Sequence, residues 1–410
     1  MNGNRHILYL TTDGITDPLG QSQILPYLKK LAQANTITII SLEKLERLTK
    51  EKELQKQLSA GPLLWIPLTF YKYPAVFAPW WNLYRMKKRA KKLCRQRTVH
   101  IVHVRSYLAG LVGLSLIKSS NIKMLFDPRG FWIDERMEGN IWNTKNPIYS
   151  IAERYLRKKE ISLYQQAHAV VLLTEKAKSY LLQHPMLKPK TTLVKVVPCC
   201  ADEALFDPKA LDKGKLENLK IKHAIKPADF LLSYHGSLGT WYKTNEAVDF
   251  FCALRTEKNN AKFLLITHDN SHSFKSYWQK QGLPLELLIY VQATREEVPY
   301  YLALSHLAVF FINPVFSKIA SSPTKMAEII LMDIPFVTNP HIGDINELIG
   351  QTTLGKLVDG FTTDKYLSAI KEILSDTKPL GKNTLKHYFS LQRGVAIYQE
   401  VYTQLTDGDS

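Results

Sequence analysis

Short apolar, β-branched runs alternate with longer segments of helical periodicity along the first half of the chain. The apolar runs occupy residues 6–11, 36–41, 63–68, 100–104, 122–126, 169–173 and 193–197. Helical patterns lie between them at residues 22–33, 108–118, 147–166 and 175–183. This alternation predicts a parallel sheet built from right-handed βαβ units.

A stretch of turn and charge signals at residues 198–227 interrupts the pattern, which then restarts. The second set of apolar runs occupies residues 230–235, 262–267, 287–291, 307–312 and 336–338. Helices are expected to start near residues 244, 274, 295, 323 and 363. We therefore predict two doubly wound α/β domains in tandem, with ligands bound beyond the carboxyl ends of the strands and a cleft between the two sheets.

The charge distribution distinguishes the two halves. The chain has 410 residues, 45% of them apolar, and a net charge of +17. Residues 1–200 hold 32 Lys and Arg against 13 Asp and Glu, a net +19, whereas residues 201–410 hold 22 against 24, a net −2. An anionic partner is thus expected for the N-terminal half alone.

Several common classes are disfavoured by what the sequence lacks. No apolar run approaches the roughly 20 residues of a membrane span, and the start has no signal-peptide pattern, so we expect a cytoplasmic protein. The four cysteines form no C-x-x-C pair, which favours reduced thiols and no zinc site.

The loop after the first apolar run leads directly into a helical pattern. Its Gly20 is expected to let backbone N–H groups approach an anion at the helix start. The spacing is neither G-x-G-x-x-G nor a Walker A loop, which counts against a dehydrogenase or an NTPase. An ordinary βα turn is the alternative.

Two segments of the second half are suited to a diphosphate. Gly236 and Ser237 are followed by Lys243, which gives a backbone turn and a point charge. An ordinary turn beside a solvated lysine is the alternative.

The second of these segments is residues 321–328. We expect Pro323 at the first helical position, Ser322 as its cap, and Lys325 and Glu328 on one helical face. Lys325 is suited to phosphate and Glu328 to a ribose diol, with a catalytic base also possible. A surface ion pair between the two is the alternative.

Segments spread over nearly the whole chain resemble the retaining glycosyltransferases of family 4, which have the GT-B fold. They are the first βα loop, residues 126–132 with Asp134 and Glu135, residues 197–202, residues 322–344 and the closing residues 388–402. Residues 126–135 resemble the subset that builds bacterial surface polysaccharides. The resemblance implies an acceptor-binding domain at 1–196, a nucleotide-sugar domain at 197–384, and a terminal helix at 385–410 that packs back on the first domain.

The resemblance also implies transfer with retention from a UDP-, GDP- or ADP-sugar, without a metal or another cofactor. Its implied catalytic residues are Lys243, Lys325 and Glu328. The implied nucleotide-sugar residues also include Gly20, Gly236, Ser237, Val291, Ser322, Pro323 and Thr324. The expected acceptor-side residues are Asp13, Arg105, Arg129, Asp134 and Glu135; solvated or structural ion-paired roles are the alternative for Arg105, Arg129, Asp134 and Glu135.

The sequence departs from the family pattern at three places. Ala320 stands where the family has the first glutamate of a pair, and Ser237 stands where an arginine is common. The interdomain asparagine and glycine are replaced by Cys199 and Cys200.

Residues 70–97, here called the aromatic–basic segment, suggest the acceptor. Seven aromatic residues precede a run at 85–97 that holds eight cations and no acid. This order predicts a helix at an anionic membrane surface and an enzyme peripheral on the inner face of the membrane, acting on a lipid-linked or polysaccharide acceptor. A solvated helix with its aromatic side chains packed inside is the alternative.

Other functions remain open at this stage. A non-catalytic GT-B relative and a nucleotide-sugar epimerase share the predicted architecture. A nucleic-acid-binding protein is disfavoured, because no reading helix or stacking platform accompanies the cations.

Overall fold

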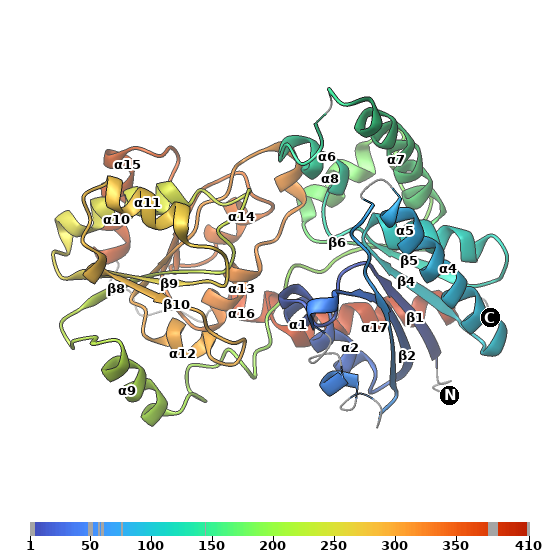
Figure 1. Cartoon of the computed structure of the whole chain (residues 1–410), viewed down its shortest axis with the longest axis horizontal. Helices are drawn as coiled ribbons and strands as arrows, with labels where there is room; N and C mark the ends of the chain where they lie inside the picture. The colour runs from blue at the N-terminus through green and yellow to red at the C-terminus, as the bar shows by residue number, and fades with distance from the viewer. Residues whose placement is uncertain are drawn as a thin grey trace. The chain divides into compact units, whose positions relative to one another are not determined.

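A computed structural model describes residues 5–47, 52–55, 58, 61–74, 77–143, 145–375 and 384–407. The chain divides into two compact units (Figure 1). Unit 1 comprises Met1–Pro198 and Leu391–Ser410, and unit 2 comprises Cys199–Ser390.

Unit 1 is built on a parallel sheet of seven described strands in the order β3-β2-β1-β4-β5-β6-β7. They are β1 (Arg5–Thr11), β2 (Asn35–Glu43), β3 (Leu63–Thr69), β4 (Ile101–Arg105), β5 (Lys123–Asp127), β6 (Ala169–Leu172) and β7 (Val194–Val196). Each predicted apolar run lies on one of these strands, because a strand covered on both faces needs apolar side chains on both.

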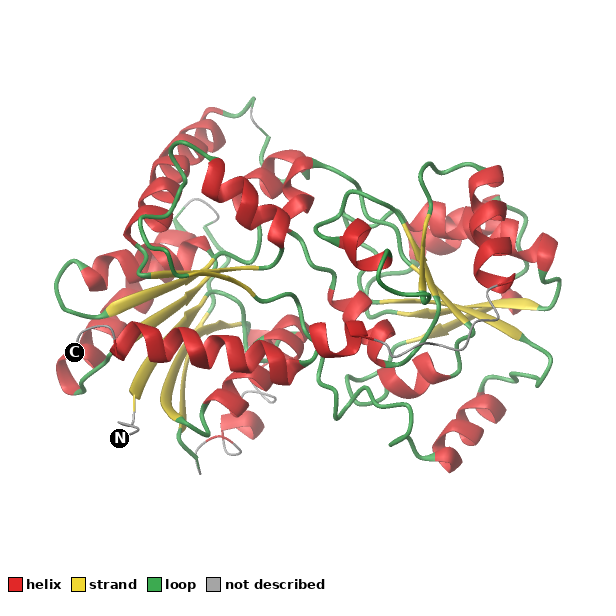
Figure 2. Cartoon of the chain, turned by 180° about the vertical axis from the view of Figure 1, so that it is seen from behind, coloured by secondary structure: helices red, strands yellow, loops and turns green. Residues whose placement is uncertain are grey.

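Helices cover both faces of this sheet (Figures 1 and 2). α4 (Ala78–Gln96), α5 (Tyr107–Ile117) and α7 (Pro147–Gln166) pack on one face, and α2 (Leu25–Leu31) packs with α17 (Leu391–Asp407) on the other. Further helices of this unit are η1 (Leu45–Arg47), α1 (Pro18–Gln23), α6 (Trp132–Glu138) and α8 (Glu175–Gln183).

The single helix predicted at residues 22–33 is wrong. α1 ends at Gln23, and Ile24 leaves helical geometry at φ −123° and ψ −63° before α2 begins. Pro26 explains the break, because it has no N–H to donate and its ring clashes with the carbonyl four residues earlier.

Unit 2 has six described parallel strands in the order β10-β9-β8-β11-β12-β13. They are β8 (Phe230–His235), β9 (Ala261–Ile266), β10 (Leu288–Val291), β11 (Leu307–Val309), β12 (Phe336–Thr338) and β13 (Gly355–Leu357). β13 was not predicted, because it has only three residues and one of them is glycine.

Helices of unit 2 cover its sheet (Figure 2). They are α9 (Lys213–Lys222), α10 (Thr244–Glu257), α11 (His272–Lys280), η2 (Leu285–Leu287), α12 (Val298–Ala303), η3 (Phe316–Ala320), α13 (Thr324–Leu331), α14 (Ile345–Ile349), α15 (Thr363–Ser375) and α16 (Thr384–Tyr388). α9 falls within the stretch of turn and charge signals, for which no helix was predicted.

Each sheet carries its own hydrophobic core. None of the helices in the described ranges is both long and apolar enough to cross a membrane. Within the same ranges, no three His, Cys, Asp or Glu side chains gather to hold a metal ion. All four cysteines are free thiols.

Candidate functional site

The strand order of unit 2 reverses between β8 and β11, and the loops after these strands form the crevice where open α/β sheets bind ligands. Gly236 directly follows β8 and has φ +93°, a conformation that favours glycine. A Cβ at this position would lie 3.5 Å from Lys325 Cε and 3.6 Å from its Nζ. Lys325, on α13, therefore lies directly against the Gly236 backbone.

The Lys325 ammonium is enclosed by aromatic rings. Lys325 is 5% exposed, and its Nζ lies 3.7 Å from the Tyr242 ring centroid and 4.2 Å from that of Tyr234. Among the described residues Nζ has no hydrogen-bond partner. Burial lowers the Lys325 pKa well below its usual value, despite the attraction of nearby carboxylates. An anion that reached this group would supply the partner it lacks.

Glu328, one turn further along α13, is buried and fully engaged. His235 Nε2 lies 2.8 Å from its Oε2, and Arg295 Nη1 donates to Oε1. Burial alone would raise the Glu328 pKa, but Arg295 and His235 outweigh it and lower the pKa to about 2. The alternative of a surface ion pair between Lys325 and Glu328 is therefore wrong, because both side chains are buried and the carboxylate pairs with Arg295 instead.

The start of α13 differs from the prediction. The helix begins at Thr324, and Pro323 precedes it in an extended conformation. The Ser322 hydroxyl accepts a hydrogen bond from the Cys199 N–H at 3.1 Å, so it does not cap the helix. The Cys199 N–H, which lies outside α13, thus donates to the Ser322 oxygen that would have to accept a helix N–H for Ser322 to cap α13.

Other predicted nucleotide residues have separate local partners. Ser237 Oγ donates to Asp269 Oδ2 at 2.7 Å, and Val291 is the buried last residue of β10. Lys243 forms an ion pair with Glu246.

Gly20 does not precede a helix, contrary to the prediction. It is the third residue of α1, and a Cβ there would lie 2.1 Å from the Gly14 carbonyl oxygen. The loop's amides are also occupied, because Ile15 N–H and Thr16 N–H donate to the buried Glu43 carboxylate at 2.7 and 3.2 Å. The glycine thus permits close backbone packing, and a carboxylate of the chain occupies these two donors.

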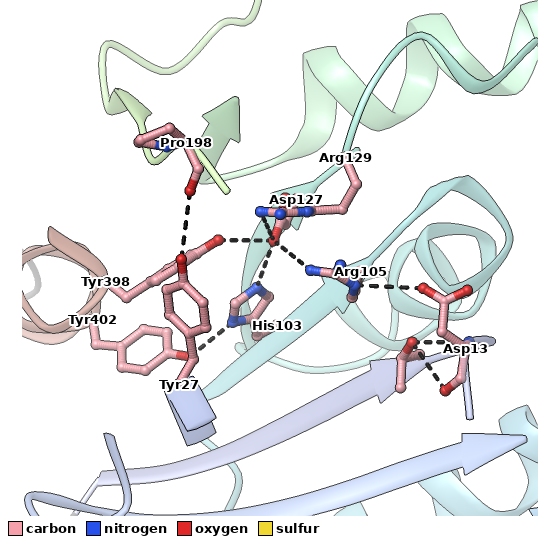
Figure 3. A network of polar contacts seen from close by, with 10 residues as sticks. Asp13, Tyr27, His103, Arg105, Asp127, Arg129, Pro198, Tyr398 and Tyr402 are labelled. Atoms are coloured by element: carbon pink, nitrogen blue, oxygen red, sulfur yellow. Dashed lines mark hydrogen bonds and ion pairs between the residues drawn. The ribbon is translucent and has the colours of Figure 1, made fainter. Parts of the chain in front are cut away.

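The sheet of unit 1 reverses its strand order between β1 and β4, and charged side chains gather there (Figure 3). Asp127 Oδ2, at the end of β5, lies 3.8 Å from Arg105 Nη1 and 3.7 Å from Arg129 Nη1. Arg105 Nε also donates to Asp13 Oδ2 at 3.4 Å. Burial would raise the Asp127 pKa, but Arg129, His103 and Arg105 outweigh it, so the pKa is lowered and the group is ionised.

Tyrosines of α17 hold this cluster from one side (Figure 3). Tyr398 donates to Asp127 Oδ2 at 2.8 Å, and Tyr402 OH lies 2.7 Å from His103 Nδ1. Burial lowers the His103 pKa, so the imidazole is neutral. His103, Arg105, Asp127, Arg129 and Tyr398 line a small cavity together with side chains of β1, α1 and α2, and its volume of about 10 Å³ is room for about one water molecule.

Asp13, Arg105 and Arg129 are therefore together, but Asp134 is not with them. Asp134 forms an ion pair with Arg157 of α7 at 2.5 Å, the structural role left open for it. Glu135 is half-buried on α6.

The aromatic side chains of the aromatic–basic segment are not packed inside, so that part of the alternative is wrong. Phe77, Trp80, Trp81 and Tyr84 are 70%, 48%, 52% and 54% exposed. Met86, Ala90 and Leu93 form the buried stripe of α4.

Solved structures share this architecture over nearly the full chain. They include a glycosyltransferase from Rickettsia africae (17% identity, TM-score 0.67, 98% of both chains). HepE from Anabaena, solved with UDP, matches at 14% identity and TM-score 0.68 over 98% of this chain and 100% of that one. WaaG, a glycosyltransferase involved in lipopolysaccharide biosynthesis, matches at 11% and 0.64 over 98% of both. The fold is that of the GT-B glycosyltransferases. No protein-family model and no curated protein sequence matches the chain.

Sequence reasoning missed several residues of these two clusters. His235 and Asp127 are polar residues at the ends of buried strands, and that position alone could have identified them. Tyr242 lies between Gly236 and Lys243, in the loop that was predicted to bind a diphosphate, so this position could also have identified it. Arg295 had no such signal, since it lies in an irregular segment before α12.

Proposed function

We propose that the protein is a retaining glycosyltransferase that moves a sugar from a nucleotide-diphosphate sugar to a lipid-linked or polysaccharide acceptor in cell-surface glycan synthesis. One observation carries the proposal: on a GT-B fold, the buried Lys325 ammonium lies against the Gly236 backbone without a hydrogen-bond partner in the described chain. A cation at a switch point is suited to a diphosphate. The UDP complex of HepE supports a nucleotide donor.

In the proposed reaction, the bond between the anomeric carbon and the diphosphate breaks, the acceptor hydroxyl oxygen bonds to the same face of that carbon, and negative charge develops on the leaving diphosphate. Lys325 and the positive end of the α13 dipole stabilise that charge. Glu328 is ionised at neutral pH because its pKa is about 2, so it has no proton to donate. It is assigned to the ribose diol, whose hydroxyls would donate to the carboxylate lone pairs that Arg295 and His235 do not use. The leaving phosphate accepts the proton of the acceptor hydroxyl, and no side chain is assigned as nucleophile.

Two further parts of the proposal concern Lys243 and the metal. Lys243 must exchange its ion pair with Glu246 to reach the diphosphate, so we give the main leaving-group role to Lys325. The sequence has one D-x-D pattern, Asp407-Gly408-Asp409, and we propose that cationic and dipolar groups, not a metal held there, stabilise the leaving group.

Nucleotide binding is the direct test. Isothermal titration of UDP, GDP and ADP against the full chain should find one that binds. Lys325→Met should then weaken its binding about 10- to 100-fold, the usual value of a hydrogen bond to a charged group.

Lys371→Met is the matched control, because Lys371 is exposed and its ion pair with Glu257 is long at 3.6 Å. It should bind like the wild type. If none of the three nucleotides binds the wild type, the transferase proposal is wrong.

The aromatic–basic segment supports a membrane-linked acceptor. Its exposed aromatic side chains precede a run of cations on α4, the combination that binds anionic lipid surfaces. Trp80 also contacts Tyr155 of α7, with ring centroids 5.6 Å apart, and Ile148 and Ile151 of α7 are 52% and 61% exposed. The proposed membrane-facing surface therefore includes the start of α7, and the protein is proposed to be peripheral on the inner face of the cytoplasmic membrane.

Flotation with vesicles tests this surface. The wild type should bind vesicles containing phosphatidylglycerol and be recovered poorly with phosphatidylcholine alone. Replacing Trp80 and Trp81 by serine should weaken binding at least about tenfold, because two large apolar side chains lose their burial in lipid.

The matched control replaces Ile221 and Leu285, which are exposed apolar residues of unit 2, by serine. Equal recovery with both lipids, or equal weakening in the control, would contradict the membrane proposal.

Ala320 favours a second candidate, a GT-B protein that binds a nucleotide sugar without turning it over. This residue is 2% exposed and stands where the resemblance implies a glutamate. The two candidates differ in one measurement: a transferase slowly hydrolyses its donor in the absence of acceptor and releases the nucleoside diphosphate, whereas a binding protein releases none.

A further inference from the structure

We propose that His235 is a positioning residue of the nucleotide site, which holds the Glu328 carboxylate in the orientation that selects a ribose over a 2′-deoxyribose. This inference rests on the proposed function, in which Glu328 receives the ribose diol.

His235 and Glu328 meet at the switch point of the unit 2 sheet. His235 is the last residue of β8 and directly precedes Gly236, and Glu328 lies on α13. Their side chains are 6% and 5% exposed, and His235 Nε2 lies 2.8 Å from Glu328 Oε2. A buried hydrogen bond therefore joins the strand that ends at the site to the helix that borders it.

The proton of this hydrogen bond belongs to the imidazole. Burial raises the Glu328 pKa, but Arg295 and His235 outweigh burial and lower the pKa to about 2, so the ionised carboxylate only accepts. Burial lowers the His235 pKa despite the nearby carboxylate, so the imidazole is neutral at pH 7 and carries a single N–H. Nε2 must hold that proton. His235 thus orients the carboxylate without adding a positive charge to the site.

Arg295 holds the other oxygen of the same carboxylate. Its Nη1 donates to Glu328 Oε1, and its guanidinium carbon lies 4.6 Å from the centroid of the Phe206 ring. The last torsion of a glutamate side chain is broad when nothing restrains it. Donors on both oxygens fix the carboxylate plane, whereas Arg295 alone would let the plane turn. His235 supplies the second of these two contacts.

The preference for ribose follows from the lone pairs that remain. An ionised carboxylate has about four of them, and Arg295 and His235 each use one. The 2′- and 3′-hydroxyls of a ribose offer two donors, and a 2′-deoxyribose lacks the first of these. A carboxylate fixed in one plane can accept from both hydroxyls at good geometry, and a turning carboxylate cannot.

A ratio of dissociation constants separates positioning from stability. If the hydrogen bond from His235 only stabilised the fold, its loss would weaken both nucleotides equally and leave the preference for ribose unchanged. A misfolded fraction lowers the number of binding sites in a titration but not the Kd of the folded molecules. The preference is therefore a readout that a purely structural role does not move.

Titration calorimetry compares UDP, GDP or ADP, whichever binds, with its 2′-deoxy counterpart. The wild type should bind the ribonucleotide at least about tenfold more tightly, the usual contribution of a hydrogen bond to a charged group. His235→Gln places an amide N–H near the position of Nε2 and should keep most of that preference. His235→Asn has the same amide on a shorter side chain that does not reach Glu328, so its preference should fall below about threefold.

His306→Asn is the matched control. His306 precedes β11, and its Nδ1 accepts a hydrogen bond from the Leu231 N–H at 3.0 Å, near the start of β8 and away from the site. This variant makes the same substitution beside the same strand and should keep the wild-type preference for the ribonucleotide.

The outcomes separate this inference from the proposed function. If none of the three nucleotides binds, the transferase proposal fails and this inference fails with it. If a nucleotide binds but the wild type does not prefer the ribose form, or if His235→Asn and His235→Gln have equal preferences, the positioning role is wrong and the transferase proposal stands. If His235→Asn does not fold, His235→Gln decides: a preference near that of the wild type supports the positioning role, and a lost preference overturns it.

Discussion

The two units place charged groups at the same topological position but compensate them in different ways. In unit 2, Glu328 is engaged by two close partners, whereas Lys325 has none in the described chain and lies on aromatic rings. In unit 1, one carboxylate, Asp127, lies near two arginines at 3.7 and 3.8 Å. The first arrangement leaves a buried cation without a hydrogen-bond partner in the described chain, whereas in the second one carboxylate is shared by two arginines.

This difference has a physical origin in the neighbouring elements. Both partners of Glu328 come from within unit 2, from the end of β8 and the segment before α12. Asp127 is held partly by α17, the last helix of the chain, through Tyr398. The unit 1 cluster therefore depends on contacts made by the C-terminal helix, and the unit 2 cluster does not.

Glu328→Gln should have the largest effect on stability. The carboxylate has a pKa of about 2 in the folded protein against an ordinary value of 4.5, a difference that corresponds to about 3 kcal/mol. Because the folded pKa is the lower one, this contribution is present above pH 4.5 and is lost as the pH falls through 2. Urea unfolding at pH 7 should show a loss of about 3 kcal/mol in the variant, and the gap should close towards pH 2.

The control for this prediction is Glu372→Gln. Glu372 pairs with Lys356 at 2.6 Å, but its side chain is 62% exposed, so the cost should stay below about 1 kcal/mol. Equal losses of unfolding free energy in the two variants would contradict the prediction that the buried Glu328 carboxylate stabilises the fold more than an exposed one.

The fold was predictable because strands covered on both faces must be apolar. The runs on β8 and β12 coincide with the observed strands, and α7 and α8 have the expected bounds. The break at Ile24 was missed because helical periodicity continues across it.

The site was predictable only in part. The position of Lys325 near a helix start identified it as a candidate, but its contacts with the rings of Tyr234 and Tyr242 were not predicted. The partners of Glu328 are 33 and 93 residues away, and Tyr398 is 271 residues from Asp127. Strand patterns indicate which edge of a sheet a residue reaches, but not which side chain it meets there.

Tyr398→Phe should have the next largest effect, on unit 1. It removes a hydrogen bond to a buried carboxylate that already has one unpaired oxygen, so we expect a loss of about 2 kcal/mol in urea unfolding. Tyr402→Phe is the matched variant on the same helix, because its partner His103 is neutral. It should cost about 1 kcal/mol. A larger loss of unfolding free energy in Tyr402→Phe than in Tyr398→Phe would show that the bond to Asp127 is not the stronger contact of α17 with this cluster.

Lys325→Met should have the smallest effect and the opposite sign. A buried ammonium without a hydrogen bond destabilises the folded chain, although the rings of Tyr234 and Tyr242 offset part of that cost. The folded pKa of Lys325 is lowered, so between that value and 10.5 the unfolded chain binds more protons and wild-type stability rises with pH. The variant should therefore gain about 1 kcal/mol in urea unfolding at pH 6, and the gain should shrink as the pH approaches 10.

Lys371→Met, which removes an exposed ammonium, should show no such trend. A variant that is less stable than the wild type at pH 6 would show that the rings fully offset the cost of burying the ammonium. Lys325 would then stabilise unit 2, as Glu328 does, and the difference between the two side chains would disappear.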